Sequence, residues 1–268
     1  MRDDQRKSSL RPHPSSLDEA YGSFAYAYDY ALGQRFFRSA RKLLSAILNR
    51  YPAKTGTHLD LACGTGLMSR FFEERGFRST AIDLSLPMLQ VARRRTPRVV
   101  AADLRSLPFR ATFARITCLY DSLNHLQELD DLRAAFAAVA ELMSSDSLFI
   151  FDVNDEAIYP KVWGMDEPFV AEGEDFHLEI ATRFRPRTRL GHARVRGWAR
   201  VGGKRIPIDE THQQRAWSRA EIIRALAGAS LAPVDVVDFD PYKEGRRVKL
   251  LFVCRPEQAV PGKVHFLP

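Results

Sequence analysis

A glycine-containing segment, His58-Leu-Asp-Leu-Ala-Cys-Gly-Thr-Gly66, has the residue types and spacing best suited to chemistry in this chain. Gly64 and Gly66 permit backbone torsions, and a close approach of a ligand, that a Cβ atom would prevent. If a helix begins directly after them, its free N–H groups favour a ligand group with negative charge. The segment therefore predicts a ligand-binding turn, although a tight connection between a strand and a helix would have the same pattern.

Two aspartates extend this candidate site. Asp83 follows the next apolar run, where an acidic side chain can accept hydrogen bonds from ribose hydroxyls. Asp103 follows a third run, and its carboxylate beside Leu104 could accept a hydrogen bond from an adenine amino group. Either aspartate could instead cap a helix or lie in a surface loop. With the glycine turn, they place three features at the carboxyl ends of successive strands, where ligands of parallel sheets bind.

The elements that must position these residues alternate between short apolar runs and amphipathic segments. We expect strands at 58–62, 79–83, 99–102, 115–120 and 147–153, and helices at 67–75, 85–95 and 130–143. An earlier amphipathic helix ends at Pro52. Strands that alternate with helices in this way predict βαβ units and a parallel sheet covered on both faces.

The pattern changes to period two between residues 169 and 217, with glycines at the expected turns. This region predicts an antiparallel meander of three or four strands. Ser218 and Glu221 then form a capping-box signature, which begins another helix. Two more strands, near 234–239 and 248–254, complete the predicted elements.

In order and spacing these segments resemble a class I S-adenosylmethionine-dependent methyltransferase, in the branch that acts on amines or hydroxyls of small molecules. The matching runs are Leu59-Asp-Leu-Ala-Cys-Gly-Thr-Gly66, Ala81-Ile-Asp-Leu-Ser-Leu-Pro-Met-Leu89, Ala101-Ala-Asp-Leu104, Leu119-Tyr-Asp-Ser-Leu-Asn-His-Leu126 and Phe149-Ile-Phe-Asp-Val-Asn154. The likeness covers residues 21–154 and, with the closing strands, extends to about 256. It implies a doubly wound, Rossmann-like α/β fold. The sheet would have seven strands with the last antiparallel, and the meander would be inserted after the fifth strand as a substrate lid.

The resemblance also implies S-adenosylmethionine as the cofactor and a role for each matching residue. Asp60 and the glycine turn would hold the methionine moiety, and Asp83 the ribose. Asp103 and Leu104 would flank the adenine, and Met88 would pack on it. The complete set of residues expected to bind the cofactor is Tyr21, Tyr28, Asp60, Ala62, Cys63, Gly64, Gly66, Asp83, Leu84, Met88, Asp103, Leu104 and Tyr120.

Several assignments keep an alternative. Ala62 stands where the family usually has glycine, but its side chain is small enough for binding to survive. Tyr21 and Tyr28 match a Tyr-x-x-x-Ala-x-x-Tyr-Asp pattern that lids the cofactor in related enzymes, or they pack the first helix on the core. Transfer from a sulfonium needs alignment more than acid–base chemistry. We therefore expect at most one weak base, His212 before His125, and either histidine could be purely structural.

Basic residues recur through the meander, at positions 183, 185, 187, 189, 194, 196, 200, 204 and 205. At period two, Arg183, Arg185, Arg187 and Arg189 would share one strand face. They could bind an anionic substrate or RNA phosphates, which makes an RNA methyltransferase the alternative function. They could equally form a solvated face paired with nearby acids. Against nucleic acid, Asp121-Ser-Leu-Asn124 lacks the Asn/Asp-Pro-Pro-Tyr motif of enzymes that methylate base amino groups.

Composition narrows the classes further. A net charge of +7 and 45% hydrophobic residues indicate a mildly basic chain that can bury a real core. Cys63, Cys118 and Cys254 form no CxxC pair, so we expect neither a disulfide framework nor a metal site, in keeping with a cytoplasmic protein. No signal peptide or membrane span is expected, since no segment approaches ~20 apolar residues. Ser69 occupies the third position of a dinucleotide fingerprint, which disfavours a nicotinamide oxidoreductase.

The expected organisation has one core and one insertion. The limits are a disordered tail at 1–16, a methyltransferase core at 17–160 and 216–256, an inserted substrate or lid subdomain at 161–215, and a C-terminal tail at 257–268. The expected partner is a small-molecule substrate, and the chain would act as a monomer or a homodimer.

Overall fold

The computed structural model describes residues 21–54, 56–242 and 248–260. The predicted tail at 1–16 lies outside the described residues, as do residues 261–268 of the predicted C-terminal tail. No helix in the described ranges is long and apolar enough to cross a membrane.

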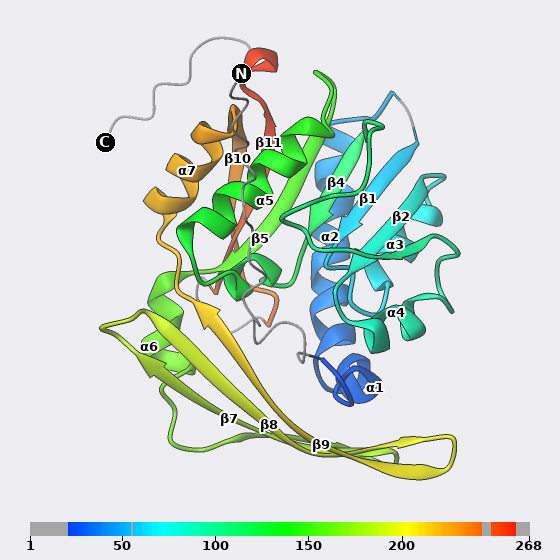
Figure 1. Ribbon diagram of the computed structural model, residues 1–268, viewed down its shortest axis with the longest axis vertical. Coiled ribbons are helices and arrows are strands. Elements are labelled where there is room, and N and C mark those ends of the chain that lie inside the picture. Colours follow the sequence, from blue (N-terminus) through cyan, green and yellow to red (C-terminus); the bar gives the residue numbers. More distant parts are fainter. Residues whose placement is uncertain (1–20, 55, 243–247, 261–268) are drawn as a thin grey trace, which may run out of the picture.

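A seven-stranded sheet forms the centre of the molecule (Figure 1) in the order β10-β11-β5-β4-β1-β2-β3. Its strands are β1 (Thr57–Leu61), β2 (Arg78–Asp83), β3 (Val99–Ala101), β4 (Arg115–Cys118), β5 (Leu148–Asn154), β10 (Leu231–Phe239) and β11 (Lys249–Pro256). Neighbours from β3 to β5 are parallel, whereas β11 runs antiparallel to both β5 and β10. The prediction of a Rossmann-like sheet with an antiparallel last strand is confirmed.

Helices cover both faces of this sheet. They are α2 (Gln34–Arg50), α3 (Leu67–Glu73), α4 (Leu86–Ala92), α5 (Leu129–Glu141) and α7 (Arg219–Gly228). Strand β5 shows why: Phe149 and Phe151 join the apolar cluster of α5 and α7, while Leu148 and Ile150 join that of α2 and α3. Because side chains alternate along a strand, a strand covered on both sides must be apolar throughout. The capping box predicted at Ser218 is present at the start of α7.

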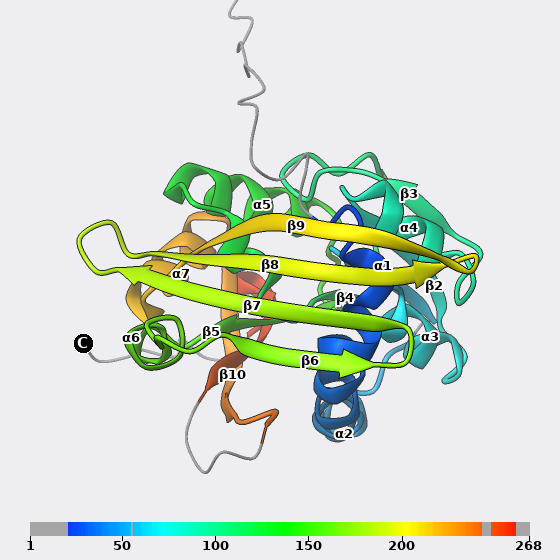
Figure 2. The same cartoon turned by 90° about the horizontal axis from the view of Figure 1, so that it is seen from below.

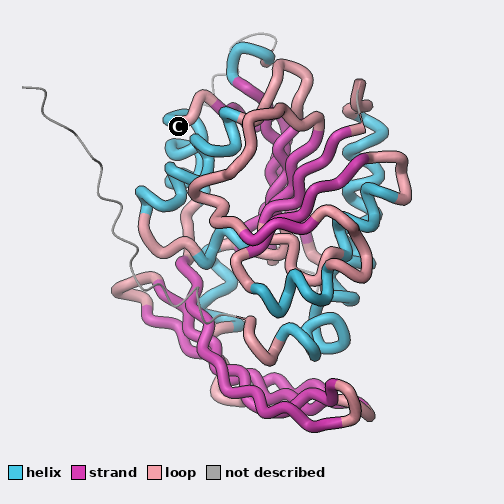
Figure 3. The backbone as a smooth tube through the Cα atoms, turned by 45° about the vertical axis from the view of Figure 1, so that its right-hand side comes forward, coloured by secondary structure: helices cyan, strands magenta, loops and turns pink. Residues whose placement is uncertain are grey.

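A second sheet is made by four antiparallel strands in the order β6-β7-β8-β9. They are β6 (Phe169–Gly173), β7 (Phe176–Arg185), β8 (Leu190–Val201) and β9 (Lys204–Arg215), and all lie within the predicted insertion. Figure 2 shows these strands laid across the underside of the molecule, and Figure 3 shows them as a twisted layer below the core. Their inner face carries Leu178, Val195 and Ile208, which pack on Phe24 and Ala27 around α1 (Ala25–Tyr28).

The outer face of this sheet differs from the prediction in one respect. Strand β7 ends at Arg185, and the turn that follows removes Arg187 and Arg189 from the shared strand face. Arg189 instead adopts a φ of 57° and forms ion pairs with Glu156 and Glu221. Period two in the sequence does not reveal where a strand stops, because a turn residue can carry the same side chain as a strand residue.

Short segments link these layers. They are a π-helical segment (Asp29–Gly33), 3₁₀ turns at Ser122–His125, Glu156–Ile158 and Glu257–Ala259, and α6 (Tyr159–Val162). The turn Ser122–His125 follows β4 and contacts both β5 and β9. It therefore lies where the second sheet meets the carboxyl edge of the first.

Candidate functional site

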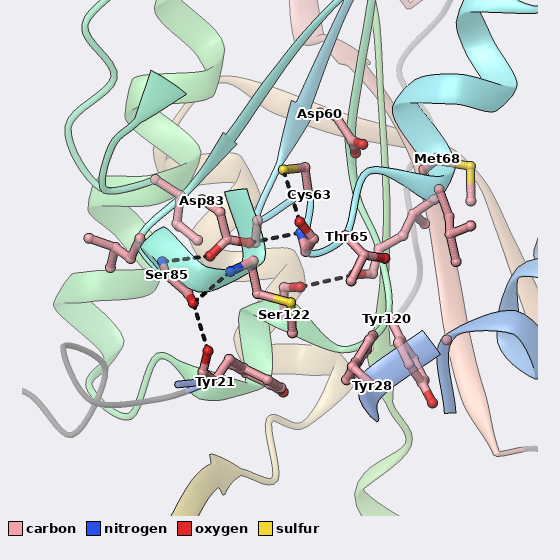
Figure 4. A pocket seen from close by; sticks show the side chains of 18 of the residues that line it. Tyr21, Tyr28, Asp60, Cys63, Thr65, Met68, Asp83, Ser85, Tyr120 and Ser122 are labelled. Carbon is pink, nitrogen blue, oxygen red and sulfur yellow. Dashed lines mark hydrogen bonds between the residues drawn. The ribbon is translucent and has the colours of Figure 1, made fainter. Parts of the chain in front are cut away.

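A pocket opens at the carboxyl ends of β1, β2, β3 and β4 (Figure 4) and holds about 1150 Å³ of space, including its part open to solvent. Of the residues predicted to bind a cofactor, the pocket is lined by Tyr21, Tyr28, Asp60, Ala62, Cys63, Gly64, Asp83, Leu84, Met88, Asp103, Leu104 and Tyr120. His125 also lines it. Residues from four successive strand ends thus meet at one edge of the sheet, as expected for parallel strands.

The glycine turn contributes two different kinds of glycine. Gly64 has a φ of 51°, and a Cβ built there would meet no described atom within 4 Å, so this position opens into the pocket. Gly66, with a φ of 80°, does not line the pocket, and a Cβ there would lie 3.1 Å from the Cβ of Ala92 in α4. Gly66 is therefore needed for the packing of the turn on α4. Ala62 also has a positive φ, 49°, which explains why glycine suits this position better than size alone suggests.

Asp83 joins the glycine turn to the start of α4. Its Oδ2 accepts a hydrogen bond from the Gly64 N–H at 2.8 Å, and its Oδ1 accepts one from the Ser85 N–H at 2.8 Å. Burial raises the pKa of Asp83, while these two backbone donors lower it. Figure 4 shows Asp83 beside Cys63 and Ser85. The Ser85 hydroxyl donates a hydrogen bond to the backbone carbonyl oxygen of Tyr21. The carboxylate is thereby held at the pocket wall from two sides.

Asp60 lies at the base of the pocket and is almost fully buried. Its two oxygens accept hydrogen bonds from Ser69 Oγ at 2.6 Å and Thr117 Oγ1 at 2.7 Å. Burial raises the pKa of Asp60 to about 6, although both hydroxyls act in the opposite direction. In the sequence, Ser69 only disfavoured a nicotinamide oxidoreductase. In the structure it is a hydrogen-bond partner of Asp60.

Asp103 has a partner that sequence reasoning missed. Its carboxylate accepts hydrogen bonds from the backbone N–H, Nε and Nη2 of Arg105, and Arg105 also pairs with Asp131 on α5. This contact occupies most of the acceptor capacity that the carboxylate has. The Asp103-Leu-Arg105 spacing was the available signal for it.

The two predicted histidines occupy different places. His125 lines the pocket, and its Nε2 lies 3.2 Å from the Tyr21 hydroxyl. Burial lowers the pKa of His125 to about 4, against the opposing effect of Asp121. His212 does not line the pocket; it is 6% exposed and packs on the ring of Tyr21, with centroids 4.5 Å apart. The structure thus favours His125 for contact with a ligand, whereas the sequence ranked His212 first.

A buried charged network beneath the pocket was not predicted. Lys249 on β11 is 1% exposed and pairs with both Asp121 and Asp152. Asp152 also accepts the backbone N–H groups of Tyr120 and Asp121, which have φ values of 64° and 51°. Left-handed backbone at two successive non-glycine residues is costly and needs such support. A single lysine in the apolar run of the last strand was the only hint in the sequence.

Comparison with known proteins identifies the class. Residues 59–146 match a methyltransferase domain family. The malonyl-[acyl-carrier protein] O-methyltransferase of Salmonella typhimurium is 32% identical over 186 residues, covering 68% of each protein. The dTDP-3-amino-3,6-dideoxy-alpha-D-glucopyranose N,N-dimethyltransferase of Streptomyces fradiae is 29% identical, covering 82% of this chain and 86% of that enzyme. The crystal structure of an S-adenosylmethionine-dependent methyltransferase from Clostridium acetobutylicum has a TM-score of 0.74 at 25% identity, covering 87% of this chain and 97% of that one.

Fold, pocket and relatives together define a methyltransferase. The chain belongs to the class I S-adenosylmethionine-dependent methyltransferases and is an enzyme that uses S-adenosylmethionine.

Proposed function

We propose that this enzyme transfers the methyl group of S-adenosylmethionine to an amine of a small molecule, and that a nucleotide-linked amino sugar is the first acceptor to test. The observation that carries the proposal is His125 in the pocket wall, with its Nε2 atom 3.2 Å from the Tyr21 hydroxyl. The Streptomyces fradiae relative, by its name, methylates the amine of such a sugar.

The pocket suits the cofactor in shape and chemistry. The open position at Gly64 allows a ligand to approach the backbone, which a side chain would prevent. Asp83 presents a carboxylate to the pocket at the place where ribose hydroxyls would bind. Apolar Leu84, Met88 and Leu104 line the adjoining wall, which suits a flat adenine ring. We assign the methionine end to the glycine turn above Asp60.

Asp103 takes a modified role in this proposal. Because Arg105 occupies much of its carboxylate, the pair is expected to border the adenine as a fixed polar edge. The adenine amino group would donate a hydrogen bond to the lone pair of Asp103 that Arg105 leaves unoccupied.

The chemistry requires placement more than proton transfer. The acceptor nitrogen would bond to the methyl carbon as the carbon–sulfur bond breaks, and the electron pair of the broken bond would stay on sulfur. The proton of the nitrogen would pass to a base or to water. Because its pKa is lowered to about 4, the His125 ring is neutral at neutral pH. Its unprotonated nitrogen can then accept a hydrogen bond from the N–H of the acceptor. Alignment of this kind can supply a large part of the rate.

The second sheet is proposed to complete the acceptor side of the pocket. Strand β9 brings Gln214 to His125, at 3.3 Å between the Nε2 atoms, so the insertion reaches the pocket wall. The basic outer face points away from this contact, and three of its arginines are paired, Arg194 and Arg196 with Asp209 and Arg200 with Asp175. These pairs weaken the case for RNA as the acceptor.

An acceptor panel tests the proposal. Purified full-length chain and S-adenosylmethionine would be incubated with a dTDP-linked 3-amino sugar, the matching 3-hydroxy sugar, a malonyl thioester and total RNA. Release of S-adenosylhomocysteine is the measurement. We expect turnover with the amino sugar and none above background with the other three. Turnover with RNA or with the malonyl thioester, and not with the amine, would overturn the proposal.

A further inference from the structure

The side-chain amide of Gln214 has a defined orientation. Its Oε1 accepts hydrogen bonds from Asn154 Nδ2 at 2.9 Å and from the Tyr159 hydroxyl at 3.1 Å. Its Nε2 faces Asp121 Oδ2, which is an acceptor. Exchanging the oxygen and nitrogen would set donor against donor and acceptor against acceptor, so the surrounding partners determine which atom is which.

That orientation decides which nitrogen of His125 carries the proton. Gln214 Nε2 can only donate, so the His125 Nε2 that lies 3.3 Å away must be an unprotonated acceptor. The Tyr21 hydroxyl, 3.2 Å from the same nitrogen, is then also a donor. The backbone of Gln213 forms a hydrogen bond that favours a proton on the ring, and Nδ1 is the nitrogen left to donate to its carbonyl.

We propose that Gln214 is a positioning residue that, with the Gln213 carbonyl, holds His125 as the neutral tautomer protonated at Nδ1. The lone pair of Nε2 is then shared by the Gln214 amide and the Tyr21 hydroxyl. An acceptor that takes the place of the Tyr21 hydroxyl must bring its own N–H or O–H to Nε2. This inference rests on the proposed function, because it gives His125 a role toward the acceptor. It deepens that function by excluding a carboxylate acceptor, which has no hydrogen to donate at neutral pH.

The charged and titratable groups around His125 agree with this selection. Asp121 on its own turn presents negative charge, which favours a donor over an anion. Lys249 on β11 is already paired with Asp121 and Asp152, and so offers little attraction to an anionic acceptor. The ring of His212 on β9 lies 6.4 Å from the ring of His125, between centroids, and the ring of Tyr21 lies 5.8 Å from it.

Nuclear magnetic resonance of the histidine rings tests the proposal without a known acceptor. Full-length chain labelled with ¹⁵N-histidine would be saturated with S-adenosylhomocysteine, and the His125 signals would be assigned by their loss in His125→Gln. We expect Nδ1 to be protonated and Nε2 unprotonated in the wild type from pH 8 down to pH 5. A wild-type ring protonated at Nε2 would overturn the proposal, and beyond the assignment variant His125→Gln this measurement uses only the wild-type chain.

A charged substitution provides the second arm. In Gln214→Glu the new carboxylate can accept a hydrogen bond from a protonated Nε2, so we expect His125 to become doubly protonated at pH 6, with its pKa above its usual value of about 6.5. Thr211→Glu is the matched control, because Thr211 is exposed on the face of β9 opposite to Gln214 and its carboxylate would point away from the ring. Its His125 spectrum should match the wild type. A neutral His125 in Gln214→Glu would contradict the proposal.

The proposed function fails separately. If the acceptor panel shows no amine methylation while the spectra show the expected tautomer, the role of Gln214 stands and the choice of acceptor is wrong. If an amine is methylated, Gln214→Glu should lower kcat by about 10²-fold. The KM for S-adenosylmethionine should stay within about twofold, since Gln214 does not line the pocket. An unchanged kcat would overturn the positioning role.

Discussion

The two walls of the pocket are built in different ways. On the side assigned to the cofactor, Gly64, Asp83 and Ser85 are joined by backbone N–H groups from turns that follow neighbouring strands. On the acceptor side, His125 depends on Tyr21 from the N-terminal segment and on Gln214 from the second sheet. The first wall is local to one sheet edge, whereas the second exists only when three distant segments are assembled.

This difference has a physical consequence. A turn with positive φ and a carboxylate that accepts backbone hydrogen bonds need only the two strands that carry them. A ring tautomer needs every neighbouring donor and acceptor in place. We therefore expect substitutions on the cofactor wall to affect binding of the cofactor, and substitutions on the acceptor wall to affect turnover.

The largest effect is expected at Gly64. Gly64→Val places a branched side chain in the pocket at a φ of 51°, so S-adenosylhomocysteine should bind more than about 100-fold more weakly by calorimetry. Gly202→Val is the matched control, because Gly202 has a φ of 56° and equally open surroundings in the turn between β8 and β9. Both variants carry backbone strain, but only the first should lose binding. Equal losses would mean that strain, and not the ligand, explains the glycine.

Asp83 should come next. Removing its carboxylate in Asp83→Ala loses the charge-assisted contact to the ribose and should cost on the order of 2–3 kcal/mol of binding free energy. Asp209→Ala, on the outer face of the second sheet, is the control and should bind normally. If Asp83→Ala bound S-adenosylhomocysteine as tightly as the wild type, the assignment of Asp83 to the ribose hydroxyls would be wrong.

The acceptor wall should respond in rate. His125→Ala should lower kcat by about 10²-fold with little change in cofactor affinity, because Nε2 would no longer hold the acceptor. His212→Ala should cost less than about 10-fold, since His212 lies against Tyr21 outside the pocket lining. Steady-state kinetics with the acceptor found in the panel would measure both. A larger loss at His212 would restore the order expected from the sequence.

The last prediction lies outside both walls and concerns the dependence of stability on pH. His58 is fully buried between Ser79 and Thr117, and burial lowers its pKa to about 3 from a usual value near 6.5. Below pH 6.5 the imidazole of His58 is therefore protonated in the unfolded chain but stays neutral in the folded chain. Stability from this group is complete above pH 6.5 and falls by up to about 1.4 kcal/mol per pH unit below it.

Urea unfolding of the wild type and of His58→Gln at pH 6.5 and pH 4.5 measures this contribution. The free energy of unfolding should fall by about 2–3 kcal/mol more in the wild type than in the variant. Parallel changes in the two proteins would show that His58 titrates normally in the fold.

Much of the fold followed from short-range patterns. Apolar runs alternating with amphipathic segments predicted the parallel sheet, because a strand buried on both faces, such as β5, must be apolar throughout. Period two predicted the second sheet, since one of its faces packs on Phe24 and Ala27 while the other meets solvent. The same pattern was wrong for Arg187 and Arg189, because it does not indicate where β7 ends.

The sequence by itself indicated the wall proposed to bind the cofactor, because Asp83 ends β2, Gly64 lies in the turn after β1, and parallel strands bring such positions to one edge. Only the tertiary structure decided the separate tasks of Gly64 and Gly66, since the second depends on Ala92 in α4. It also decided that His125 lines the pocket and His212 does not. Gln214 and Lys249 could not have been linked to the pocket in advance, because hydrogen bonds and ion pairs between residues far apart in the chain exist only once β9 and β11 have packed on the turn after β4.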